Sequence, residues 1–316
     1  MKVGIFGTDD DPQVHAVAKE LRALGAEDVL IRADALSEGL PLSNLDGKFI
    51  YRGLDTTELE GFYLRSIPAP YAPSMEDANG DVVLYDDWFV RYMHDRERAS
   101  FYVAWLLSLQ QRGVRLVNPP HAASVLQYKP FQLDALRSVG ATVPKTLISN
   151  DPVAIRAFKQ QVGDVIFKPV MGGAITQRLE GEALERLEDV RASPVIFQET
   201  IGGDDLRVML AGNDVVSCVA IRTPEQHLDF RDDPFYSGGQ ATYEEVTLPD
   251  AVIEQCRKAA RLCGLAFAGI DIKRSPDGRW VFLELNSSPI YLDVEWKLGH
   301  PISRAVAELV VGTRTF

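Results

Sequence analysis

Two apolar strands joined by a tight turn, close to the end of the chain, constrain the fold more than any other feature of the sequence. Residues 269–274 and 279–286 are β-prone and mostly apolar, and the Ser-Pro-Asp-Gly between them is a strong turn signal. We therefore predict an antiparallel hairpin. If its loop holds two or four residues, Asp271 faces Phe282, and directly opposed residues share one face of a sheet.

One face of this hairpin collects side chains that carry oxygen. With that pairing Asp271, Glu284 and Asn286 lie together, whereas Leu283 and Leu285 point to the opposite, apolar face; a loop of three residues would reverse the parity. Two carboxylates on neighbouring strands repel each other unless they are protonated, paired or bridged by a cation. Mg²⁺ prefers such oxygen ligands, so this face is either a metal site or an ordinary solvent-facing side of the sheet.

The beginning of the chain has the pattern of a parallel α/β domain. Residues 2–7 are predicted to form a buried strand, Asp11 and Pro12 to start a helix, and residues 28–32 to form a second strand. Residues 49–92 contain three short strand-like pieces (FIYR, FYLR and FVRY), and an amphipathic helix follows over 96–112. A break at Asn118-Pro119-Pro120 then indicates an N-terminal domain over residues 1–117.

The remaining residues alternate strands and helices and divide into predicted domains over 118–200 and 201–316. Helices are expected over 129–139, 151–161, 249–263 and 301–311, and strands over 146–149, 165–168, 195–199, 206–211 and 215–222. A long loop over 223–243 interrupts this pattern. Loops of this length in compact domains tend to bind or cover substrates.

Composition narrows the class of protein. The chain has 316 residues, and 33 basic against 45 acidic residues give a net charge of −12, with the basic residues scattered, which argues against binding nucleic acid or a membrane surface. We expect a cytoplasmic protein, because the N-terminus does not resemble a signal peptide and no stretch is apolar enough to span a membrane. Assembly into a homo-oligomer is compatible with the sequence. The three cysteines lack zinc-site spacing and are expected to be core thiols.

A phosphate group would explain a metal on the hairpin. Lys168 ends an apolar strand, and the turn Met171-Gly172-Gly173-Ala174 after it has backbone amides that an anion can approach. Lys129 begins a helix, where charge and free amide donors combine. Each lysine alone is more often a solvated surface residue. Neither a P-loop nor a dinucleotide-binding motif is present.

The order of these features resembles the ATP-grasp superfamily, and specifically the RimK-type ligases related to glutathione synthetase. A helix-opening lysine after an Asn-Pro break is followed by VIFKPVMGG, VIFQETIGGDDLRV, AIR, GIDI and FLELNSSP. The resemblance covers about residues 118–311. It implies a mixed α/β (α+β) ATP-grasp fold preceded by a Rossmann-like pre-ATP-grasp domain.

The resemblance also implies roles for particular residues. Lys129, Lys168, Gly172, Gly173, Gln198, Glu199, Ile201 and Asp205 match nucleotide-binding positions; Asp271, Glu284 and Asn286 match metal ligands; and Arg207 and Arg222 match arginines that face the γ-phosphate and the carboxyl substrate. The glycine-rich loop is short for the family, with two glycines.

The activity that the resemblance implies is an ATP-dependent carboxylate–amine ligation through an acylphosphate, with Mg²⁺ or Mn²⁺ and an amino acid or peptide substrate. A second hypothesis is a ligase that joins side chains of a ribosomal precursor peptide. A third, from another class, is a nucleotide-binding module that no longer catalyses. The presence of both lysines and all three metal-site residues argues against the third.

Overall fold

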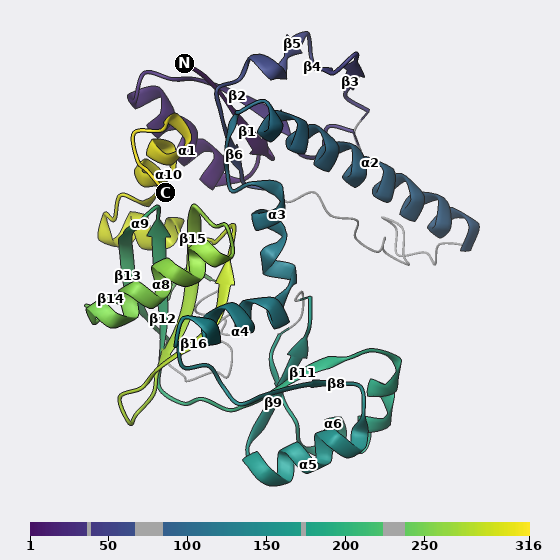
Figure 1. The fold of residues 1–316 in the computed structure, drawn as a ribbon, viewed down its shortest axis with the longest axis vertical. Helices are drawn as coiled ribbons and strands as arrows, with labels where there is room; N and C mark the ends of the chain where they lie inside the picture. The colour runs from purple at the N-terminus through teal and green to yellow at the C-terminus, as the bar shows by residue number, and fades with distance from the viewer. Residues whose placement is uncertain (37–38, 67–84, 172–174, 224–237) are drawn as a thin grey trace. The chain divides into compact units, whose positions relative to one another are not determined.

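The computed structural model of the chain describes residues 1–36, 39–66, 85–171, 175–223 and 238–316 (Figure 1). The chain forms two compact units, one of Met1–Ala123 with Val306–Thr315 and one of Ser124–Ala305 with Phe316. Residues 306–315 therefore belong to the first unit, whereas the predicted domain over 201–316 includes them. Within the described ranges no helix has the length and hydrophobicity to cross a membrane.

The first unit is built on a four-stranded parallel sheet in the order β2-β1-β6-β7. Its strands are β1 (Lys2–Gly7), β2 (Glu27–Arg32), β6 (Gly61–Leu64) and β7 (Arg115–Val117). The helix α1 (Pro12–Ala23) links the first two, and the Asp11 side chain caps it by accepting a bond from the Gln13 amide. The predicted βαβ opening is confirmed. A small antiparallel sheet of β3 (Leu42–Leu45), β4 (Lys48–Tyr51) and β5 (Leu54–Asp55) adjoins it.

A long helix, α2 (Tyr85–Gln111), occupies the place where FVRY was predicted to be a strand, so that prediction is wrong. The aromatic rings explain the helix, because Trp88 and Tyr92 are four residues apart and stack with their centroids 5.5 Å apart. Further along, Trp105 is fully buried, donates a hydrogen bond of 2.9 Å to Thr56 Oγ1, and packs edge-on against Phe62. This helix thereby forms the core of the first unit.

The second unit contains two antiparallel sheets. The central one has the order β10-β9-β11-β8, from β8 (Thr146–Ser149), β9 (Val165–Pro169), β10 (Gln177–Arg178) and β11 (Val195–Glu199). Helix α5 (Pro152–Val162), the short α6 (Gly181–Glu185) and a 3-10 helix, η3 (Leu187–Ala192), pack on one face around Phe197 (Figure 1). Strand residues alternate between faces, so Ile166, Lys168 and Gln198 lie on the other face.

The other sheet has five strands in the order β14-β13-β12-β15-β16. They are β12 (Asp204–Ala211), β13 (Asp214–Arg222), β14 (Thr242–Glu245), β15 (Phe267–Arg274) and β16 (Trp280–Asn286). Helices α4 (Lys129–Ser138) and α8 (Asp250–Leu262) pack against it, α9 (Leu292–Leu298) follows β16, and α10 (Ile302–Val311) ends the fold. Two further short helical segments, α3 (Pro120–Ala123) and η2 (Ser124–Gln127), precede α4. All three cysteines are buried, as predicted.

The register of the β15–β16 hairpin differs from the predicted one. The turn holds three residues, because the Ser275 amide bonds to the Arg279 carbonyl oxygen, and Ile272, not Asp271, pairs with Phe282. A β-bulge between Asp271 and Ile272 then shifts the register once more, so that Asp271 pairs with Glu284. The three-residue turn alone would put Asp271 and Glu284 on opposite faces of the hairpin. The bulge brings them back to the same face. The prediction that the two carboxylates share a face is confirmed, although the pairing behind it was wrong.

Candidate active site

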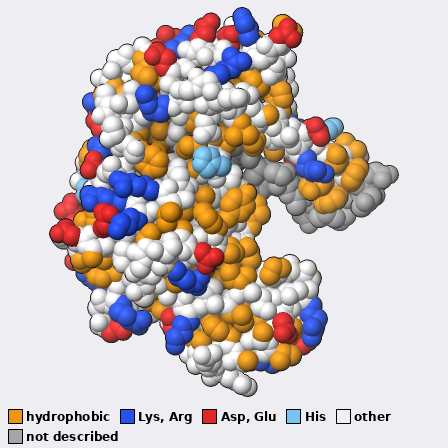
Figure 2. Space-filling model, in the orientation of Figure 1, with side chains coloured by type: hydrophobic (Ala, Val, Ile, Leu, Met, Phe, Trp, Pro, Cys, Tyr) orange, Lys and Arg blue, Asp and Glu red, His pale blue; other side chains and the backbone are white. Residues whose placement is uncertain are grey.

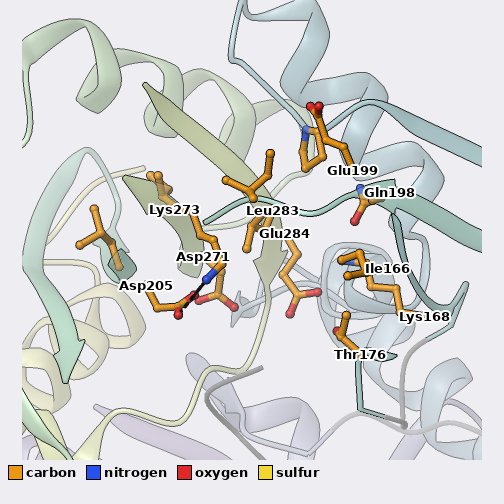
Figure 3. Close-up of a pocket in the computed structure, with 14 residues that line it drawn as sticks. Ile166, Lys168, Thr176, Gln198, Glu199, Asp205, Asp271, Lys273, Leu283 and Glu284 are labelled. Carbon is orange, nitrogen blue, oxygen red and sulfur yellow. Dashed lines mark hydrogen bonds and ion pairs between the residues drawn. The ribbon is translucent and has the colours of Figure 1, made fainter. Parts of the chain in front are cut away.

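A pocket lies between the two sheets of the second unit (Figure 3). The central sheet contributes Ile166 and Lys168 from β9 and Gln198 and Glu199 from β11, and the five-stranded sheet contributes β12, β15 and β16. The pocket is lined by Pro144, Ile166, Lys168, Thr176, Gln198, Glu199, Ile201, Asp205, Leu206, Asp271, Ile272, Lys273, Leu283 and Glu284. Seven residues predicted from the sequence are among them.

Two carboxylates stand at the centre of this pocket. Asp271 and Glu284 face each other across β15 and β16 and are only 8% and 9% exposed. Glu284 forms an ion pair with Lys129, which begins α4. Asp271 pairs with Arg207, whose Nε lies 2.6 Å from Oδ1, and accepts a 3.1 Å hydrogen bond from Asn286 Nδ2 on its other oxygen. Each buried negative charge is thus balanced by a neighbouring cation.

The bulge has a further effect on the pocket lining. Leu283 was predicted to share the apolar face with Leu285, but the structure places it in the pocket beside Glu284. At a bulge two residues of one strand oppose a single residue of its partner, so the regular alternation of faces is interrupted there. Leu283 therefore gives the pocket an apolar surface next to the two acids, and Leu285 remains fully buried.

A second ion pair lies two residues along β15 and β12 from the Asp271–Arg207 pair. Lys273 Nζ is 2.8 Å from Asp205 Oδ1, and both residues line the pocket (Figure 3). The predictions included Asp205 but missed Lys273. The place of Lys273 in the pocket depends on the pairing of β12 with β15, which brings Asp205 opposite Lys273. These strands are far apart in the sequence.

The β11 strand forms the wall opposite the acids. Gln198 is 1% exposed and its Nε2 donates a 3.0 Å hydrogen bond to Thr146 Oγ1. Glu199 Oε1 accepts a 2.9 Å hydrogen bond from the Lys145 backbone amide, so this side chain fixes the start of β8. Both residues line the pocket together with Ile201.

The two predicted arginines have different surroundings. Arg207 is 9% exposed and contacts Asp271. Arg222 is not among the residues that line this pocket; it forms an ion pair with Asp204 and lies 2.6 Å from Glu244 Oε2 through Nη2. Arg274 also pairs with Asp204, at 2.6 Å, and these two guanidinium groups lower the pKa of the Asp204 carboxyl. Gly172 and Gly173 lie outside the described residues.

Asp271, Glu284 and Asn286 offer two carboxylates and an amide oxygen, which suit Mg²⁺ in number and type, since Mg²⁺ is usually held by one or two carboxylates. Among the described residues no group of three or more His, Cys, Asp and Glu side chains could hold a metal ion.

On the face shown in Figure 2, Lys and Arg side chains lie interspersed with Asp and Glu.

Comparisons with known proteins agree with this geometry. The family described as RimK-like ATP-grasp domain matches residues 127–310. A probable alpha-L-glutamate ligase from Hahella chejuensis is 29% identical over 224 residues, which are 67% of this chain and 72% of the relative.

Two solved structures are similar over nearly the whole chain. The ATP-grasp ligase PsnB, solved with a phosphomimetic variant of its minimal precursor, Mg and ADP, is 34% identical with a TM-score of 0.83, covering 98% of this chain and 97% of that one. The macrocyclase MdnC from Microcystis aeruginosa, bound to its precursor peptide MdnA, is 23% identical with a TM-score of 0.80, covering 98% and 99%. The second likeness concerns the fold alone.

Proposed function

The chain belongs to the RimK-like ATP-grasp family of ligases, and we propose that its substrate is a precursor peptide, in which it joins a carboxyl side chain to a nucleophilic side chain. One observation carries this choice. PsnB is 34% identical and matches 98% of the chain, so the likeness includes the N-terminal unit as well as the region 127–310 that the family matches. PsnB was solved with a minimal precursor, which supports a peptide as the substrate of this chain.

A second candidate is the addition of a free amino acid to a protein or peptide. The relatives named as probable alpha-L-glutamate ligases favour it. Both candidates use the same chemistry. They differ in whether the carboxylate and the nucleophile belong to one molecule.

ATP is the proposed cosubstrate, with its phosphates near Lys129 and Lys168 and its base beside Gln198, Glu199 and Ile201. Asp205 would contact the ribose. The pocket places five of these six residues on its walls, and Lys129 reaches it through Glu284. Gly172 and Gly173 are proposed to cover the phosphates.

Asp271, Glu284 and Asn286 are the proposed ligands of Mg²⁺, or of Mn²⁺, which takes similar donors. Such an ion neutralises charge on the phosphate oxygens when it is bound. The donor set suits such an ion. The two carboxylates are balanced by Lys129 and Arg207 in this structure, and a bound ion would balance them instead. The two basic side chains would then be available to phosphate oxygens.

The chain's own residues work by positioning and charge neutralisation. A substrate carboxylate must approach the γ-phosphorus of ATP, and both are negative, so Lys129, Lys168 and Arg207 lower the repulsion. The resulting acylphosphate is attacked by the nucleophile, phosphate leaves, and the new bond forms. Arg207, which is buried beside the two acids, stabilises the oxyanion of this second step.

Turnover measurements test the proposal. The protein is incubated with MgATP and either a library of synthetic peptides that contain Glu with Lys or Thr, or the free amino acids. ADP release together with a peptide product that has lost one water supports peptide modification. Product formation only with free glutamate as a cosubstrate would support the second candidate. ATP binding without ADP release under all conditions would contradict both and favour a non-catalytic module.

A further inference from the structure

A second, smaller pocket lies on the five-stranded sheet and is not part of the nucleotide site described above. Residues that line it include Arg207, Ile221, Tyr243, Ile290 and Asp293. They come from β12, β13, β14, the segment that leads into α9 and the first turn of α9 itself. All of them belong to the second unit.

Strand register places this pocket on the same face of the sheet as the acids. Asp205 pairs with Ile221 across β12 and β13, and Ile221 pairs with Tyr243 across β13 and β14. Directly opposed residues share a face, so this row continues from Asp205 in the first pocket to Tyr243 in the second. Arg207, two residues after Asp205, lies on that face as well and lines the second pocket while it contacts Asp271. Arg207 therefore lines the second pocket and, through Asp271, contacts a residue that lines the first.

Asp293 is the acidic residue among those that line the second pocket, and it forms an ion pair with Lys297. Tyr243 Oη donates a hydrogen bond of 2.7 Å to Asp293 Oδ2, and Lys297 Nζ lies 2.9 Å from the same oxygen. Lys297 also donates to the carbonyl oxygens of Gly239 and Ala241, at 2.7 Å each. These contacts fix the orientation of the carboxylate through one oxygen. A carboxylate can accept further bonds on the other.

The other described residues that line the pocket have aliphatic or aromatic side chains. Ile221 and Val294 are 8% and 5% exposed, and Tyr291 is 1% exposed. The Asp293 side chain is 36% exposed and its charge is balanced by Lys297, so a ligand ammonium would be recognised mainly by a hydrogen bond to the second carboxylate oxygen. The pocket thus has a basic group, Arg207, beside the metal-site acids and an acidic group, Asp293, among its other lining residues.

This arrangement of charged groups matches the second half of the ligation. The acylphosphate is an anion, and a primary amine in water is a cation. We propose that the second pocket binds the nucleophile of the reaction, that this nucleophile is a primary amine, and that Asp293, oriented by Tyr243, recognises its ammonium group. The inference rests on the proposed ligase function.

The proton and bond changes follow from this placement. The bound ammonium gives one proton to the Asp293 carboxylate and becomes a neutral amine. Its nitrogen forms the C–N bond as the C–O bond to phosphate breaks, and phosphate leaves with the electron pair of that bond and takes the second nitrogen proton. Asp293 is partly exposed and returns its proton to solvent.

The test separates the two half-reactions in the full-length protein. Hydroxylamine, a small neutral nucleophile, traps the acylphosphate as a hydroxamate and so reports the first step alone. Asp293→Asn should leave hydroxamate formation within about twofold of wild type and lower kcat/KM for amide formation roughly a hundredfold, the range of a lost acid–base group. Tyr243→Phe should have a smaller effect of the same kind, and Asp293→Glu should restore part of the activity. Peptides that differ only in Lys or Thr at the acceptor position serve as probes.

A matched control is Asp134→Asn on α4. Asp134 also pairs with a basic residue one helical turn away, Arg137 at 2.9 Å, but its side chain is 76% exposed and lines neither pocket. It should match wild type in both steps. Thermal unfolding of each variant shows whether it is folded.

Three outcomes would overturn the inference. They are an Asp293→Asn enzyme that forms the amide at the wild-type rate, equal loss of hydroxamate and amide in a folded variant, or a wild-type enzyme that uses Thr peptides and rejects Lys peptides. Failure of the proposed function looks different, because the wild-type protein would then form neither ADP nor hydroxamate. If Asp293→Asn does not fold, the same comparison is made with Tyr243→Phe, whose wild-type rate of amide formation would count against the proposal.

Discussion

Asp271 lies directly opposite Glu284 because a bulge in β16 offsets the three-residue turn that joins the two strands. Without the bulge, the turn would pair Asp271 with Leu283 and leave Glu284 on the other face. The irregularity therefore assembles the pair of buried acids. Bulges are over-represented next to active sites, where they redirect a side chain.

The first prediction concerns Glu284 as a metal ligand and partner of Lys129. Glu284→Gln should remove the gain in ADP affinity that Mg²⁺ provides, and lower turnover by at least about a hundredfold, as loss of a charge-stabilising group does. ADP binding without Mg²⁺ should be unchanged or tighter, because Lys129 loses its internal partner. Calorimetric titration with ADP, with and without Mg²⁺, measures both effects.

The matched control for this change is Glu254→Gln on α8, whose carboxylate pairs with Lys258 at 3.6 Å on the protein surface. This variant should keep the wild-type Mg²⁺ effect. If Glu284→Gln also keeps it, the metal assignment is wrong.

How much of this site can be predicted from the sequence depends on how far apart in the sequence the contacting residues are. Lys129, Lys168 and the hairpin acids follow from local signals: a helix start, a strand end and a turn. Lys273 and the bulge do not, because the pairing of β12 with β15 joins distant segments and a bulge has no strong local signature. The FVRY segment was misread because four residues cannot distinguish a strand from one turn of an aromatic helix.

A second prediction distinguishes the two arginines. Arg207, which contacts Asp271 at 2.6 Å and 3.4 Å, is proposed to move its guanidinium to the reacting oxygens when the metal binds. Arg207→Lys should lower turnover roughly a hundredfold, because lysine lacks the planar two-point donor geometry of a guanidinium. Arg222→Lys should stay within about threefold of wild type, since we propose that Arg222 acts in the surface ion-pair cluster. Steady-state ADP release measures both. Equal losses in the two variants would return Arg222 to the catalytic group.

A third prediction concerns the pH dependence of stability. Hydrogen bonds and charge from Arg222 and Arg274 lower the pKa of Asp204 in the folded state. A lowered pKa stabilises the fold at pH values above the unfolded pKa of about 3.9, and this contribution disappears as pH falls through the folded value. Asp204→Asn should therefore cost about 1 kcal/mol at pH 7, a modest figure because both arginines are partly exposed.

Urea unfolding of wild type and Asp204→Asn at pH 7 and below pH 4 tests the sign. The difference in unfolding free energy should shrink toward the acid end. A difference that stays constant or grows on acidification would show that the effect of the substitution is not electrostatic.

The last prediction concerns Gly269, which pairs with Asn286 next to the acids. A Cβ on this residue would stand 2.5 Å from Pro289 Cβ, closer than real Cβ atoms approach, and 3.1 Å from its Cγ, which is also a tight contact. Gly269→Ala must therefore displace Pro289 and the residues that link it to Asn286, at a cost of about 1–3 kcal/mol, as overpacked cores show. Because Asn286 donates to Asp271, turnover should fall by more than the stability loss explains. Gly202→Ala is the control, since no atom lies within 4 Å of the position that its added methyl group would take, and should leave both unfolding free energy and ADP release near wild type. An unperturbed Gly269→Ala enzyme would show that the Pro289 segment can shift without disturbing the acids.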